Sequence, residues 1–251
     1  MASDASAQVT LFFPSHSRLN TQNQNHLLNQ LPAPDRERLV SRSARIAGKS
    51  RALVYPQNGA VTHVYFPLSG VISLVRTGEN GTDTIEVGMV GNEGMAGLPG
   101  FLGAWKTPAS AMWQAPGEAY RMGADAFHEE LKMSPALRAL LGRYAVAVSA
   151  QMMQSVLCNS FHPIEQRLCR WLLMSHDRVG VDGLPLTQEF IAQMLGIRRP
   201  SVTVAAGQLQ RAGLIRYRRG TITVLDRRSI ETGACECYGT VRRDMESLLL
   251  P

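Results

Sequence analysis

Hydrophobic and polar positions change their period along the chain, and each change marks a different kind of element. From Leu53 to about Tyr120, short runs rich in β-branched residues alternate with turn residues about every 8–12 positions, a spacing typical of antiparallel β-structure. The clearest runs are Val61–Phe66, Val71–Val75 and Thr84–Val90. The Asn80-Gly81 pair between the last two runs is a strong β-hairpin signal. The pattern predicts an antiparallel roll or barrel.

Helical spacing predominates on both sides of this region. Leu27–Ile46 has a helical pattern interrupted by Pro32 and Pro34, and Gly123–Leu131 predicts a short helix. A long helix is expected from Pro135, a residue suited to a first helical position, to His162. Its apolar stripe contains Leu137, Leu141, Tyr144, Val148, Met152 and Ser155. This stripe is wide enough for the roll and for a second copy of the helix, which favours a homodimer; packing on its own domain alone is the alternative.

Two short helices that cross steeply are predicted within the segment Leu186–Leu225. Ala192 supplies the small residue that such a crossing needs, and Gly196 follows four residues later as a turn residue that tolerates positive φ. Thr187 is a good N-cap for the first helix, and Pro200 suits the first turn of the second. The apolar seam between them would contain Ile191, Leu195, Ile197, Val202 and Ala205. Together these features indicate a helix-turn-helix.

A short β-hairpin is expected to follow the second helix. Gly213 can end that helix in a left-handed conformation, after which Leu214–Tyr217 and Thr221–Leu225 are predicted as two strands. The residues that join them are Arg218, Arg219 and Gly220. A hairpin with arginines at its tip is the wing of a winged helix, and it is well placed to contact a phosphate backbone.

The charge of the chain is concentrated in this same region. The formal net charge is +6, and between positions 198 and 228 eight arginines stand against one acidic residue, Asp226. These arginines are at positions 198, 199, 211, 216, 218, 219, 227 and 228. Such a concentration of positive charge is typical of a polyanion-binding surface.

Composition and length narrow the class of protein. At a typical domain size of roughly 150 residues, the 251 residues suggest about two domains. No apolar run reaches the roughly 18–20 residues of a membrane helix, and the N-terminus has no signal-peptide pattern. Four cysteines in a chain without such a signal do not indicate a disulfide scaffold. We therefore expect a cytoplasmic protein without a membrane partner.

The winged helix-turn-helix of Leu186–Leu225, preceded by a β-roll and a long helix, resembles the Crp/Fnr family of bacterial transcription regulators. The resemblance implies an α+β fold: an antiparallel β-roll of the double-stranded β-helix type, a long dimerisation helix and a C-terminal winged helix-turn-helix domain. The expected division is a flexible extension over 1–26, a cyclic-nucleotide-binding-like sensor domain over 27–134, the dimerisation helix and hinge over 135–162, and the DNA-binding domain over 163–251. Expected partners are a second copy of the chain, double-stranded operator DNA and RNA polymerase.

The resemblance also assigns DNA-binding residues. Arg199 matches the family's guanine-reading arginine of the recognition helix, whereas Pro200 and Val204 replace base-reading residues of many members, so direct readout is expected to differ. A bidentate arginine–guanine pair contributes roughly 1–3 kcal/mol of discrimination. The expected DNA contacts are Thr187, Gln188, Arg198, Arg199, Ser201, Thr203, Arg218 and Arg219. Of these, Thr187 would offer its hydroxyl or N–H to a phosphate, and Arg218 and Arg219 would add salt-sensitive affinity; the alternative for each arginine is a solvated surface charge.

The effector segment departs from the cyclic-nucleotide-binding pattern. Met95 stands where such members have the ribose-binding glutamate, and Ala109 where they have the arginine that pairs with the cyclic phosphate. Without that arginine the phosphate loses its charge-assisted pair. We expect a degenerate domain that binds another small molecule or none, and the candidate pocket residues are Glu93, Gly94, Gly97, Leu98 and Ser110.

No cofactor and no metal are expected. An iron–sulfur cluster needs four thiolates, and the N-terminal extension that supplies most of them in the family's oxygen sensors has no cysteine here. Cys158 and Cys169 are expected to be buried apolar residues. The pair Cys235 and Cys237 leaves a metal or redox role open. As haem ligands, His63, His128 and His162 would be lone candidates without a supporting pattern.

No enzyme motif accompanies these features. The chain has no P-loop, nucleophile elbow, zinc-protease motif or Rossmann glycine pattern. We therefore predict a regulator rather than an enzyme, with no catalytic residue. The alternative is a scaffold or regulatory subunit that acts through protein contacts. The effector, the operator sequence and the choice between activation and repression stay open.

Overall fold

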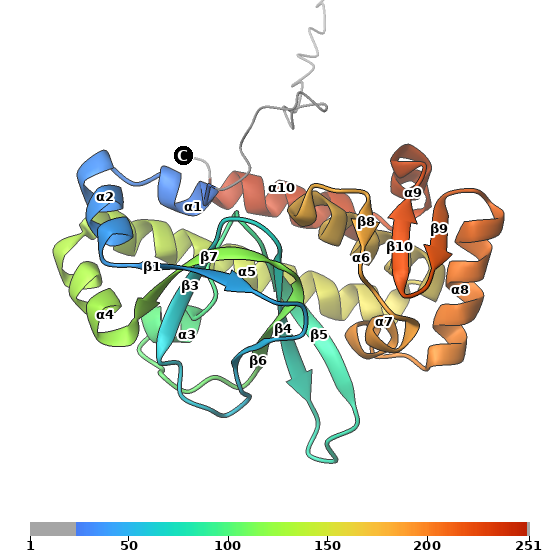
Figure 1. Ribbon diagram of the computed structural model, residues 1–251, viewed down its shortest axis with the longest axis horizontal. Coiled ribbons are helices and arrows are strands. Elements are labelled where there is room, and N and C mark those ends of the chain that lie inside the picture. The colour runs from blue at the N-terminus through green and yellow to red at the C-terminus, as the bar shows by residue number, and fades with distance from the viewer. Residues whose placement is uncertain (1–23, 250–251) are drawn as a thin grey trace, which may run out of the picture.

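The computed structural model describes residues 24–249 (Figure 1). The N-terminal half is an antiparallel roll of two sheets, with strand orders β1-β7-β3 and β2-β6-β4-β5. Its strands are β1 (Ala44–Gly48), β2 (Leu53–Tyr55), β3 (His63–Pro67), β4 (Val71–Thr77), β5 (Thr84–Val90), β6 (Ser110–Ala115) and β7 (Gly117–Gly123). The predicted roll is confirmed. Its helices are α1 (His26–Asn29), α2 (Ala33–Ser41), α3 (Leu98–Phe101) and α4 (Ala124–Met133).

The predicted β4–β5 hairpin forms around Asn80 and Gly81. Thr77 pairs with Thr84 at the end of the ladder, and the backbone N–H of Gly78 donates to the carbonyl of Asp83 at 2.8 Å. Gly81 has a φ of 72°, a conformation that glycine adopts without steric cost. The hairpin signal in the sequence therefore identified both strands and the turn.

Part of the N-terminal helical prediction is wrong. The segment around Ile46, expected to be helical, is strand β1, which pairs along its whole length with β7; this pairing within the sheet overrides the local helical pattern. The expected flexible extension lies outside the described residues up to position 23. Asn25, which was included in it, is 2% exposed and donates side-chain hydrogen bonds to the carbonyls of Pro67 and Gly94.

The long helix α5 (Pro135–Phe161) follows the roll and has 27 residues. Ser134 caps it, because its hydroxyl accepts from the N–H of Leu137 at 3.0 Å. One face of α5, with Leu141, Tyr144 and Val148, packs into the core of the roll. The opposite face stays exposed and carries apolar side chains that the predicted stripe did not include, Val146, Met153 and Val156.

The C-terminal half contains the winged helix. Its elements are α6 (Ile164–Val179), β8 (Gly183–Leu184), α7 (Gln188–Leu195), α8 (Arg199–Arg211), β9 (Ile215–Arg218), β10 (Thr221–Val224), α9 (Arg227–Gly233) and α10 (Cys237–Leu249). The last helix, α10, returns along α5 (Figure 1). Its terminal residue Leu249 packs into the same core cluster as Leu137 and Leu141 of α5. The C-terminal half therefore contacts the N-terminal half at two separate places.

The second contact is a shared core between the roll and α6. Val71, Val75 and Met89 of the roll belong to one hydrophobic cluster with Trp171 and Leu172 of α6. A polar group is buried at this boundary: the Glu86 carboxylate accepts hydrogen bonds from Trp171 Nε1 at 2.9 Å and from the hydroxyl of Ser73. Burial raises the pKa of Glu86 to about 7. The junction thus contains a carboxyl group that is half protonated near neutral pH.

Candidate nucleic-acid interface and effector cavity

The two helices of the predicted helix-turn-helix meet as the sequence indicates. Gly196 ends α7 with a φ of 62°, and the N–H of Ile197 donates to the carbonyl of Ala192 at 3.0 Å. Val202 and Ala205 of α8 are fully buried against α7. A Cβ atom on Gly196 would lie 2.8 Å from Ile85 Cδ1, so the turn also packs closely on the β4–β5 hairpin of the roll.

Arg198 and Arg199 lie at the N-terminal end of α8. Arg198 is its N-cap residue and Arg199 its first residue, with Pro200 next. Both arginines are exposed, and among the described residues neither has an ion-pair or hydrogen-bond partner for its guanidinium. The positive end of the helix dipole adds to this charge. The arrangement suits an anionic partner that approaches the end of α8.

Other predicted contacts on these helices are partly occupied. The Thr203 hydroxyl donates to Gln188 Oε1 at 2.8 Å, so these two side chains tie α8 to α7. Ser201 is half-buried in the first turn of α8. The Thr187 hydroxyl caps α7 by accepting from the N–H of Phe190 at 3.2 Å.

Arg51 is a residue of this surface that sequence reasoning missed. Its Nη2 donates to the Thr187 hydroxyl at 2.9 Å, and its guanidinium lies 5.5 Å from the centre of the Phe190 ring. Arg51 belongs to the β1–β2 turn of the roll and has a φ of 66°, unusual for a residue with a side chain. No sequence pattern signals a contact across 136 positions. In this conformation the Thr187 hydroxyl is engaged within the protein.

The wing has its two arginines at the tip. Arg219 and Gly220 form the turn between β9 and β10, with φ values of 50° and 77°. A two-residue hairpin turn of type I′ requires positive φ at both of these positions. Asparagine or aspartate is the usual first residue of such a turn. Arg218 and Arg219 are exposed, and the described residues provide neither with a partner. The N–H of Tyr217 donates to Gln210 Oε1 at 2.7 Å, which fixes the wing against α8.

Seven of the eight arginines between positions 198 and 228 are exposed. The exception is Arg227, which pairs with Asp177 at 2.6 Å and with Glu231 at 3.0 Å. It also donates to the Tyr238 hydroxyl at 2.7 Å. Arg227 therefore has a structural role, and the positive surface comprises the other seven.

A cavity of about 180 Å³ lies between the roll and α5. Its lining residues are Tyr55, Leu74, Val90, Met95, Ala96, Gly97, Leu98, Pro99, Leu102, Thr107, Pro108, Ala109, Tyr144, Ala145, Val148, Ser149 and Met152. None of these side chains is charged. The volume is below the roughly 300–1,000 Å³ of typical ligand pockets.

Only two of the five candidate pocket residues, Gly97 and Leu98, line this cavity. Glu93 instead pairs with Arg178 of α6 at 2.8 Å. Gly94 lies against Tyr144, whose hydroxyl would be 2.2 Å from an added Cβ. The Ser110 hydroxyl donates to the carbonyl of Val75 at 3.2 Å. Met95 and Ala109, the two positions that depart from the cyclic-nucleotide pattern, do line the cavity.

Three of the four cysteines come together with a histidine. Cys158 and His162, at the end of α5, meet Cys235 and Cys237, and their sulfur and nitrogen atoms all lie within 4.8 Å of one another. Sequence reasoning treated these residues separately. The available signals were the four-residue spacing of Cys158 and His162, which places both on one helical face, and the short spacing of Cys235 and Cys237.

Two family models match the chain in the order of its halves. Residues 49–134 match the cyclic nucleotide-binding domain, and residues 166–232 match the Crp-like helix-turn-helix domain. No curated protein matches the chain in sequence. The two matches confirm the predicted order of sensor and DNA-binding modules, and they identify a regulator rather than an enzyme.

Solved structures share the fold at low sequence identity. A Crp/Fnr-family transcriptional regulator from Eubacterium rectale superposes with a TM-score of 0.65 at 19% identity, over 82% of this chain and 96% of its own. The c-di-GMP-responsive global regulator CLP of Xanthomonas campestris gives 0.63 at 17% identity, over 77% and 99%. A CRP-family regulator from Thermus thermophilus gives 0.62 at 18% identity, over 75% and 96%. Within residues 24–249, no helix is long and apolar enough to span a bilayer.

Proposed function

The chain belongs to the Crp/Fnr family of transcription regulators, and from this premise we propose that it acts as a homodimer that binds a two-fold-symmetric DNA operator. The observation that carries the proposal is the exposed, unpartnered pair Arg198 and Arg199 at the N-terminal end of α8. The same four-part division is proposed: extension 1–26, sensor 27–134, dimerisation helix and hinge 135–162, DNA-binding domain 163–251. We also propose that the protein is cytoplasmic and that RNA polymerase is a further partner.

In the proposed DNA complex, α8 enters the major groove by its N-terminal end. Arg199 would donate two hydrogen bonds to a guanine, and Arg198 would contact a base or a phosphate nearby. Ser201, Thr203 and Gln188 lie along the same edge. Thr187 would bind a phosphate through its N–H, since its hydroxyl is engaged by Arg51. At the wing tip, Arg218 and Arg219 would bind phosphates without regard to sequence.

The exposed face of α5 supports the dimer. Gly142, Val146, Ser149, Met153, Val156 and Ser160 follow one another at alternating spacings of four and three residues, which is the pattern of a two-helix seam. Val146, Met153 and Val156 are 54%, 66% and 67% exposed. Large apolar side chains exposed this far along one helix face are typical of an interface. A second copy of α5 is the occupant that fits their spacing.

The cavity supports the view of a degenerate effector domain. A cyclic nucleotide brings a phosphate charge, and no charged side chain lines the cavity to pair with it. Tyr55 is one of its few polar groups, and its hydroxyl accepts from the N–H of Gly97 at 3.2 Å. Burial raises the pKa of Tyr55 to about 12, so this hydroxyl stays neutral. The effector, if the domain has one, would be a small and mainly apolar molecule.

The experiment is a selection of binding sites from a random duplex library with wild-type protein, Arg199→Ala and Arg76→Ala in parallel. Arg76 is an exposed arginine of the roll and serves as the matched control. We expect wild type and Arg76→Ala to enrich one symmetric motif with half-sites about one turn apart, ~10–10.5 bp. Arg199→Ala should lose the guanine preference in both half-sites.

Two results would contradict parts of this proposal. If Arg199→Ala selects the same motif, another residue reads the guanine although the regulator assignment stands. If wild type gives only salt-sensitive binding without enrichment, even after addition of cell extract, sequence-specific recognition is wrong. In that case a scaffold that acts through protein contacts becomes the better interpretation.

A further inference from the structure

Four side chains with metal-binding atoms converge where α5 ends. The sulfur atoms of Cys158 and Cys235 are 3.5 Å apart, and Cys237 Sγ is 3.4 Å from His162 Nδ1. Cys158 and Cys237 are fully buried and Cys235 is 5% exposed. The fourth cysteine, Cys169, lies outside this cluster. Buried thiols beside an imidazole are the donor set that zinc prefers.

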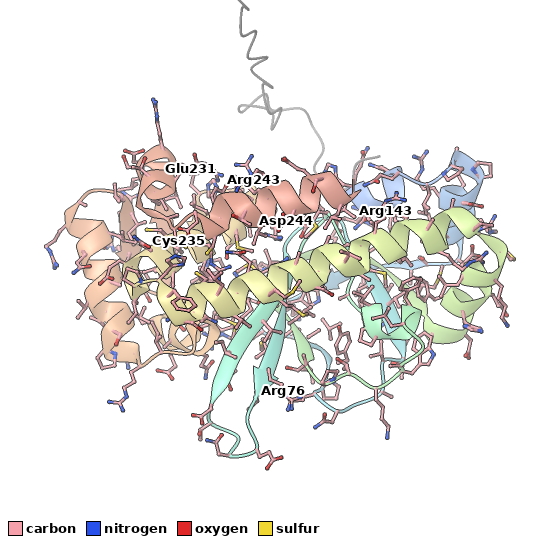
Figure 2. The ribbon with its side chains drawn as sticks, turned by 180° about the vertical axis from the view of Figure 1, so that it is seen from behind. Arg76, Arg143, Glu231, Cys235, Arg243 and Asp244 are labelled. Carbon is pink, nitrogen blue, oxygen red and sulfur yellow. The ribbon has the colours of Figure 1, made fainter. Side chains whose placement is uncertain are left out.

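The fold brings this set together from two distant segments. Cys158 and His162 lie one turn apart at the C-terminal end of α5, and the His162 N–H donates to the Cys158 carbonyl at 3.1 Å. Cys235 and Cys237 flank Glu236 at the start of α10 (Figure 2, where Cys235 is labelled). Because α10 packs along α5, the two pairs face each other.

We propose that Cys158, His162, Cys235 and Cys237 bind one zinc-class divalent cation in a closed tetrahedral site. With metal–sulfur and metal–nitrogen distances of about 2.3 and 2.1 Å, the edges of such a tetrahedron are about 3.6–3.8 Å. The Cys158–Cys235 and Cys237–His162 separations of 3.5 and 3.4 Å are within about 0.3 Å of these edges. The widest separation, at most 4.8 Å, needs to contract by about 1 Å. Four protein ligands leave no open position, which is typical of a structural site.

Residues around the four ligands complete the arrangement. The Glu236 carboxylate is 3.1 Å from His162 Nε2. A carboxylate on one imidazole nitrogen fixes the proton there and leaves the other nitrogen, here Nδ1, free to bind a metal. On the opposite side, Gln154 Nε2 donates to Cys237 Sγ at 3.0 Å. Both contacts are of the kind that orients ligands in known zinc sites.

The surrounding charge also favours a metal thiolate. A divalent cation with three thiolates and one neutral histidine has a net charge of −1. Arg167 and Arg170 are both buried, and the Nε of each has no hydrogen-bond partner within the described residues. Electrostatic interactions link Arg170 to Cys158 and Arg167 to Cys158 and Cys235. Two buried cations are costly beside neutral thiols and are compensated beside thiolates.

The alternatives for this cluster are less well supported. A multi-iron cluster holds its ligands around a larger frame than four atoms within 4.8 Å allow. A disulfide between Cys158 and Cys235 would bring two sulfurs to about 2.05 Å and leave Cys237, His162 and Glu236 without a role. One cation uses all four donors and both supporting contacts.

The test is a titration of reduced, metal-free full-length protein with Co²⁺. We expect one Co²⁺ per chain, with thiolate-to-cobalt absorption in the near ultraviolet and the intense visible bands of tetrahedral cobalt. Zn²⁺ should displace the cobalt and abolish both signals. Cys237→Ser should weaken Co²⁺ binding at least 100-fold, whereas the matched control Cys169→Ser should bind like wild type.

A milder variant keeps the test decisive if a cysteine variant fails to fold. Glu236 is exposed, so Glu236→Gln should fold normally and weaken Co²⁺ binding by about 10–100-fold. The proposal is overturned if reduced wild type gives no stoichiometric cobalt–thiolate signal. Equal losses in Cys169→Ser and Cys237→Ser would also overturn it, as would a native Cys158–Cys235 disulfide in protein that binds no Co²⁺ after reduction.

Discussion

The winged domain and the β-roll each match a family model, over residues 166–232 and 49–134, yet they present different groups to a partner or ligand. In the winged domain, seven arginines between positions 198 and 228 are exposed on the surface. In the roll, glycines let the backbone approach core side chains closely, as Gly94 approaches Tyr144. Its cavity is lined by uncharged side chains, among them Met95 and Ala109, where the family resemblance led us to expect a glutamate and an arginine in members that bind cyclic nucleotides.

This difference separates the requirements of folding from those of binding. Glycines and apolar residues of the roll are needed for its turns and core whatever the cavity holds. Their presence therefore does not indicate that the roll binds a ligand. Exposed arginines contribute nothing to a core, and Arg219 even occupies a backbone conformation that a side chain disfavours. Residues that stability does not require are therefore the better evidence for function.

The largest effect we expect comes from a residue outside the winged domain. Met153→Glu places a charge in the proposed seam of α5 and should dissociate the dimer. Because two linked half-site contacts exceed one by about 10²–10⁴-fold in affinity, operator binding should fall at least 100-fold. Fluorescence anisotropy with the selected duplex measures the affinity, and analytical ultracentrifugation the mass.

The matched control is Arg143→Glu, which is also exposed on α5 but lies about 90° around the helix from the seam. It should leave the mass at that of a dimer. A Met153→Glu protein that stays dimeric and binds normally would show that the dimer uses another surface. DNA binding by the winged domain would then not depend on the pairing of α5 with a second copy of this helix.

A second effect concerns the boundary between the two regions. The pKa of Glu86 is raised from 4.5 to about 7 by burial, so between these values the folded protein holds a proton that the unfolded chain has released. This group's contribution to the free energy of unfolding therefore falls as the pH rises from about 4.5 to 7, by about 3 kcal/mol at most. Glu86→Gln should remove this slope and make the protein more stable than wild type at pH 8.

Urea unfolding at pH 5, 6.5 and 8 measures the effect. The control is Glu118→Gln, because Glu118 is a half-buried carboxylate of the roll that pairs with Arg45; it should retain the slope of wild type. If Glu86→Gln keeps that slope as well, Glu86 does not titrate near neutral pH, and the junction does not respond to protons through this group.

A smaller effect is expected at the wing. Arg218→Ala and Arg219→Ala should each weaken binding about 3–10-fold on specific and random duplexes alike. Each should also reduce the slope of log K against log salt by about 1 per wing. Anisotropy titrations over a range of salt concentrations give both quantities. A loss confined to the selected operator would mean that the wing reads bases.

The smallest expected effect is none. About 1 mM cyclic AMP or cyclic GMP should leave the melting temperature of wild type unchanged, because a ligand stabilises only the state it binds and the cavity offers no partner for the phosphate. Differential scanning fluorimetry measures the shift. A rise of several degrees in the melting temperature would mean that the roll binds a cyclic nucleotide. It would contradict the contrast drawn between the roll and the winged domain.

Local signals in the sequence predicted the parts of the structure that depend on neighbouring residues. The hairpin at Asn80 and Gly81 and the turn at Gly196 follow from residues that tolerate positive φ. The strand at Ala44–Gly48 was missed because its partner residues in β7 lie 69–77 positions away. The meeting of Cys158 with Cys235 was missed for the same reason, as it depends on how α10 packs on α5. Contacts between distant segments leave no local pattern.

The return of α10 along α5 limits how the two halves can move. A domain joined at one point can pivot in any direction, but this one is attached both at His162–Pro163, where α5 passes into α6, and through α10 to the core around Leu137. The core that α6 shares with the roll is a third contact, so the two halves cannot rotate as rigid bodies without repacking that core. A signal from the roll would then reach the winged domain as a change in the packing around Trp171, not as a free swing about the end of α5.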